Sequence, residues 1–71
     1  MEKEKIVIKL NGKNYSIMKD INIETLIKEL NLQKKSFALA LNSEVVKKEN
    51  FRKIIIQPNS KIEIISAVGG G

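Results

Sequence analysis

The chain has 71 residues, carries a net charge of +5, and contains neither cysteine nor histidine. A chain of this length forms one small domain with a single core and little room for an enclosed active site. The missing residue types exclude disulfides, thiolate nucleophiles, imidazole bases and soft-metal sites, so we expect no bound metal and no bound cofactor.

The first predicted element is a β-hairpin. Two short runs rich in apolar residues, 6–10 and 13–18, flank Asn11-Gly12. Asn-Gly favours a type I′ turn because both positions need a positive φ angle. A two-residue turn fixes the register, so Ile8 should face Tyr15 on the core side of the hairpin.

Residues 22–30 are predicted to form an amphipathic helix. Its apolar residues follow the spacing of one helix face, and they are Ile23, Leu26, Ile27 and Leu30. Asn22 is a favourable N-cap and Asn31 a plausible end of the helix.

The second half of the chain predicts short strands. Residues 37–41 are apolar throughout and indicate a central strand, whose two alanines would form a small face close under the helix. Further short segments are expected at 44–46, 54–56 and 61–65, with Phe51 anchoring the intervening loop. One helix across a mixed sheet of four or five strands is an α+β layout, that of a ubiquitin-like β-grasp domain.

The chain closes with Ser66-Ala67-Val68-Gly69-Gly70-Gly71. We therefore divide it into a β-grasp domain, residues 1–66, and a flexible carrier tail, residues 67–71. Glycine has no Cβ, so this tail is thin enough to enter a narrow channel in a partner. Its carboxylate could be adenylated by an ATP-using partner and then attacked by sulfur or by a lysine amine. The simpler interpretation is a frayed terminus.

Nothing else in the chain predicts catalysis. The sequence shows no metal-ligand cluster, nucleophile elbow or phosphate-binding loop, so we expect a carrier and not an enzyme. Lys47, Lys48, Arg52 and Lys53 form a basic cluster that would steer an acidic partner. A single arginine and few aromatic residues argue against nucleic-acid binding. Without an apolar leader or membrane span, we expect a cytoplasmic protein.

Two segments resemble the ThiS family, the sulfur carrier proteins of thiamine biosynthesis. Residues 38–46 read Ala-Leu-Ala-Leu-Asn-Ser-Glu-Val-Val, and residues 64–71 end in Ala-Val-Gly-Gly-Gly. The resemblance extends over the whole chain, including the hairpin and the helix. The turn at 58–60, Pro-Asn-Ser, lacks the Asp-Gly-Asp often found there, and Gly69 fills a position that varies in the family.

The resemblance implies a set of partners and roles. A ThiF-type adenylating enzyme would activate the Gly71 carboxylate with ATP, and a sulfur-donating enzyme would supply the sulfur of a thiocarboxylate. A ThiG-type thiazole synthase would receive it. Gly69 and Gly70 would thread the partner's active site, with Val68 at its mouth and the carrier a monomer in transient complexes.

Two alternatives share the activation step. One is a carrier like the small subunit of molybdopterin synthase, a family that usually has Pro-Pro where this chain has Ser66-Ala67. The other is a ubiquitin-like modifier that is joined to lysines.

Overall fold

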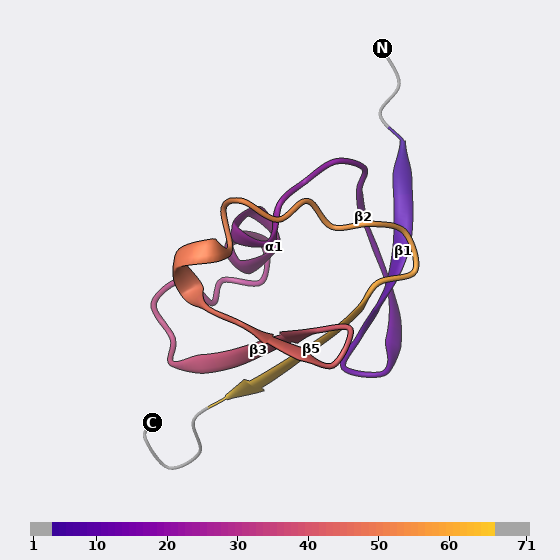
Figure 1. The fold of residues 1–71 in the computed structure, drawn as a ribbon. Coiled ribbons are helices and arrows are strands. Elements are labelled where there is room, and N and C mark those ends of the chain that lie inside the picture. Colours follow the sequence, from indigo (N-terminus) through magenta and orange to yellow (C-terminus); the bar gives the residue numbers. More distant parts are fainter. Residues whose placement is uncertain (1–3, 67–71) are drawn as a thin grey trace.

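A five-stranded mixed sheet with one α-helix across it forms the fold in the computed structural model, which describes residues 4–66 (Figure 1). The strand order is β2-β1-β5-β3-β4. The last strand pairs parallel with β1 and antiparallel with β3, which confirms the expected β-grasp layout. The elements are β1 (Lys5–Leu10), β2 (Lys13–Met18), α1 (Ile23–Glu29), β3 (Phe37–Leu41), β4 (Glu44–Val46), the short 3₁₀ helix η1 (Lys48–Asn50) and β5 (Lys61–Ser66).

Two tight hairpins build the outer parts of the sheet. In the first, Ile8 pairs with Tyr15 as predicted, and the turn residues Asn11 and Gly12 have φ angles of 51° and 84°. The β3–β4 hairpin uses the same kind of turn at Asn42 and Ser43, with φ angles of 51° and 76°. Both turns hold their strand pairs in one register.

The helix begins at its predicted cap. The Asn22 side chain accepts a hydrogen bond from the backbone N–H of Thr25 at 2.8 Å. Leu30 is the C-cap, and Asn31 follows with a φ angle of 59°, a left-handed conformation that ends the helix. Three of the four residues of the predicted apolar face, Ile23, Leu26 and Ile27, belong to the core, and Leu30 packs against it partly buried.

The core lies between α1 and the inner face of the sheet. Its members are at most 6% exposed and come from every part of the chain: Ile8, Ile17, Ile23, Leu26, Ile27, Leu39, Phe51, Ile56 and Ile62. Burying one such side chain stabilises the folded state by roughly 1.5–3 kcal/mol. Phe51 lies in this core, as the sequence predicts, and it holds the segment after η1 against the helix.

The structure corrects the predicted orientation of β3. Leu39 points into the core and is 1% exposed, whereas Ala38 is exposed on the opposite face. The alanines therefore do not lie under the helix. The large side chains of this strand take the inner face because their burial removes more apolar surface from water. Residues 54–56 form no strand of their own, and Ile55 makes a single bridge to Asn22.

The helices of residues 4–66 include none with the length and apolar character that a membrane span requires.

Candidate functional site at the end of β5

The strand that leads into the predicted tail lies in the middle of the sheet. β5 has β1 on one side and β3 on the other, and Figure 1 shows β3 and β5 side by side below α1. Its pairing with β3 runs from Leu41 opposite Ile62 to Phe37 opposite Ser66. The last described residue is therefore still part of the sheet, so the position and direction of the chain at this point are fixed.

Two turn asparagines hold the same strand. The Asn11 side-chain oxygen accepts a hydrogen bond from the backbone N–H of Ile64 at 2.8 Å. The Asn42 side-chain oxygen accepts one from the backbone N–H of Lys61 at 2.9 Å. The backbone N–H of Asn11 donates to the carbonyl oxygen of Ile62 at 2.8 Å, and that of Asn42 donates to the carbonyl oxygen of Lys61 at 2.7 Å. Both hairpin turns thus anchor β5, a function of these turns that the sequence did not indicate.

The predicted carrier residues themselves, Val68, Gly69, Gly70 and Gly71, lie outside the described residues. Their roles in threading and in carrying the adenylate and sulfur stay predictions.

Apolar side chains also lie on the outer face of the sheet near the end of β5. Ile65 is 65% exposed and Val45 is 77% exposed. Ala38 pairs with Ile65, and Ala40 pairs with Val45, so these residues form one strip across three strands. Sequence reasoning missed this strip. The sequence feature that could have predicted the strip is the pair of consecutive isoleucines at 64 and 65. Consecutive residues of a strand point to opposite faces of the sheet, so one of the two must lie on the outer face.

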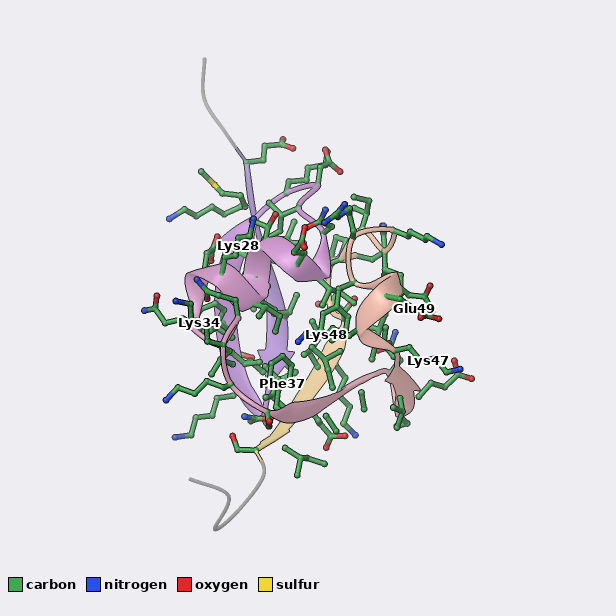
Figure 2. All side chains as sticks on the ribbon, turned by 90° about the vertical axis from the view of Figure 1, so that its left-hand side faces the viewer. Lys28, Lys34, Phe37, Lys47, Lys48 and Glu49 are labelled. Carbon is green, nitrogen blue, oxygen red and sulfur yellow. The ribbon has the colours of Figure 1, made fainter. Side chains whose placement is uncertain are left out.

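A second feature is a cleft between α1, β3 and η1, which we call the aromatic cleft and define by Phe37, Phe51, Lys28, Lys35 and Lys48. Two adjoining hollows of about 240 and 150 Å³ share the two phenylalanines and Lys48 in their walls. The phenylalanine rings stack with their centroids 6.1 Å apart and their planes 16° from parallel. Figure 2 looks onto this face and shows Lys28, Phe37 and Lys48 around the cleft.

Within residues 4–66, two cations form ion pairs. Lys19 lies 3.1 Å from Glu4, and the hydrogen bond and charge of that carboxylate raise the pKa of Lys19. Arg52 lies 3.4 Å from Glu24. The lysines of the aromatic cleft take part in neither pair.

The structure separates members of the predicted steering cluster. Lys48 lines the aromatic cleft, whereas Lys47 and Glu49 line a different hollow beside β4. Figure 2 shows Lys47 and Glu49 on the far side of η1 from Phe37. Arg52 forms its ion pair with Glu24, and Lys53 is exposed. Steering of a partner by these residues stays a prediction.

The described part of the chain brings together no group of three or more acidic side chains that could hold a metal ion.

Comparisons with known proteins agree on one family. The profile of the ThiS family matches residues 8–71. The sulfur carrier protein ThiS of Bacillus subtilis is 32% identical over 66 residues, which cover 92% of this chain and all of that protein. An uncharacterized protein ycf40 of Trieres chinensis is 36% identical over 62 residues, covering 87% of this chain and 85% of the relative.

Two further similarities are to a solved structure and to part of a longer protein. The crystal structure of thiamine biosynthesis protein ThiS from Geobacter metallireducens superposes with a TM-score of 0.80 at 25% identity, covering 93% of this chain and all of that one. A thiazole synthase of Paramagnetospirillum magneticum is 30% identical over 62 residues, which cover 87% of this chain but 19% of that protein.

Proposed function

Because the chain belongs to the ThiS family, we propose that it is a sulfur carrier of thiamine biosynthesis whose Gly71 carboxylate receives the sulfur. The observation that carries the proposal is that the family match extends through the glycine tail to residue 71. The similarity to a sulfur carrier protein over its full length supports the same function.

The proposed chemistry uses the tail as a co-substrate. A carboxylate oxygen of Gly71 attacks the α-phosphate of ATP, and pyrophosphate leaves. The terminal sulfur of a persulfide donor then attacks the acyl carbon of the adenylate and displaces AMP, which gives an acyl disulfide. A thiol attacks the donor's sulfur in that S–S bond, so the donor leaves as a mixed disulfide with the thiol and Gly71 keeps a thiocarboxylate. A ThiF-type enzyme would supply the adenylating site, and a separate enzyme would supply the sulfur.

Thiazole synthase is the proposed recipient of the sulfur. The alignment with part of a protein that bears this name supports the pairing. The role of this chain in that step is to present the tail, and the pairing of β5 with two strands and two asparagine side chains suits it to do so.

Gly70→Val tests whether the tail must enter a narrow site. Val at this position adds a stiff β-branched side chain to the tail. We expect the circular dichroism spectrum, and so the fold, to be unchanged. The rate at which a ThiF-type enzyme adenylates Gly71 should fall about a hundredfold, the size of effect that misplaced reacting atoms cause. Lys13→Val, which adds the same side chain in an exposed strand position, serves as the control and should be activated normally.

Two results would speak against the proposal. Normal activation of Gly70→Val would remove the argument from steric access. Adducts that join Gly71 to lysine side chains of other proteins, with no thiocarboxylate formed, would favour a ubiquitin-like modifier instead.

A further inference from the structure

The aromatic cleft has an apolar floor and a positively charged rim. Phe51 is 6% exposed, and Phe37, which stacks on it, is partly exposed at the surface. Lys35 and Lys48 line the larger hollow, and Lys28 joins Lys48 at the smaller one. Lysine stems lie readily along apolar surface while the ammonium groups stay in water. A ligand that enters between them meets aromatic carbon below and ammonium groups at the sides.

The charge of this cleft is unbalanced. Glu24 is the one acidic residue in its walls among the described residues, and Arg52 already contacts both of its oxygens at 3.4 and 3.5 Å. Three like charges around one apolar floor repel one another, and an anionic ligand relieves that repulsion. The complementary ligand therefore carries carboxylates around an apolar side chain.

The shape of the cleft suits a side chain of a protein segment. Each of its two adjoining hollows, of about 240 and 150 Å³, has room for one apolar side chain of a partner. Nucleic-acid bases need open aromatic faces for stacking, whereas the two rings here stack on each other.

The cleft is adjacent to the end of β5, which immediately precedes the predicted tail in the sequence. Phe37, in its floor, pairs directly with Ser66, the last residue of β5. Five fully extended residues span at most about 18 Å, so a protein that holds Gly71 also lies close to this cleft. We propose that the aromatic cleft docks an acidic segment with one apolar side chain, carried by the enzyme that activates Gly71. This inference rests on the proposed function.

A peptide titration tests the cleft without any enzyme activity. The probe is acetyl-Asp-Glu-Phe-Glu-Asp-amide, added to the full chain labelled with ¹⁵N. We expect saturable amide shifts at Phe37, Lys48 and Phe51. Lys35→Glu/Lys48→Glu should weaken binding about tenfold, because two attractive contacts become repulsive. Lys5→Glu/Lys13→Glu, with the same change in net charge on exposed strand residues, should leave binding within about twofold of wild type.

Three results would overturn the docking proposal: no saturable shifts in the cleft, equal binding of the peptide with serine in place of phenylalanine, or displacement of the peptide by polyuridylate. The absence of saturable shifts would show that the cleft is not a binding site. Equal binding of the serine peptide would show attraction by charge alone, and displacement by polyuridylate would show a nucleic-acid surface.

Activation kinetics then connect the cleft to the partner. With a ThiF-type enzyme, Lys35→Glu/Lys48→Glu should raise the KM for the carrier about tenfold and leave kcat within about twofold, since the tail is unchanged. An unchanged KM would show that the activating enzyme does not use the cleft. If wild-type protein is not activated at all, the proposed function fails, while the peptide titration still reports on the cleft.

Discussion

At the scale of single residues, asparagine accounts for much of the backbone geometry around the candidate site. Within residues 4–66, four of the six non-glycine residues with positive φ are asparagines, a conformation that this side chain tolerates better than most. Asn11 and Asn42 additionally hydrogen-bond β5. The turns were predictable from local sequence. The bonds to β5 were not, because their partners are 53 and 19 residues away.

Asn42→Ala and Asn42→Gly separate the two contributions of this residue. The alanine variant loses the hydrogen bond and strains the turn, so the free energy of unfolding should fall by about 2 kcal/mol. The glycine variant loses the hydrogen bond alone and should lose about 1 kcal/mol. Urea unfolding measures both. Equal losses in the two variants would show that the left-handed conformation costs nothing here.

At the scale of elements, α1 depends on its surroundings because seven residues form too short a helix to be stable alone. Its apolar spacing and its cap were both readable from sequence. The connection of that cap to the distant segment after η1 was not. The Asn22 side chain donates to the carbonyl of Arg52 at 3.2 Å, and its backbone bridges Ile55. The same long-range packing brings β3, α1 and η1 together to form the aromatic cleft, so local patterns could not predict it.

Asn22→Ala should lower the free energy of unfolding by about 1–2 kcal/mol, since it removes the cap and the bond to Arg52. Asn22→Asp keeps an acceptor for the helix N-terminus, so its free energy of unfolding should fall by less. Thermal or urea denaturation of the two variants measures this difference. If the aspartate variant is as unstable as the alanine one, the amide's bond to Arg52 outweighs the cap.

At the scale of the whole molecule, the proposed function assigns structure and chemistry to two different parts of the chain. The core fixes β5 in the centre of a mixed sheet, and the proposed chemistry lies entirely in the residues that follow it. The layout of the fold could be predicted because the hairpin, the helix, β3, β4 and β5 each carry a local pattern and the resemblance to ThiS spans them all. Residues 54–56 carry a similar apolar pattern but form only a single bridge. The aromatic cleft and the outer apolar strip required the assembled sheet, since each combines residues from separate elements.

The proposed function is tested most directly by the intact mass of the protein after incubation with a ThiF-type enzyme, ATP and a sulfur donor. We predict a mass gain equal to the replacement of one oxygen by sulfur, located at Gly71 by fragmentation and absent when ATP is omitted. An unchanged mass under conditions in which the enzyme forms AMP from this carrier, or sulfur found on any other residue, would contradict it.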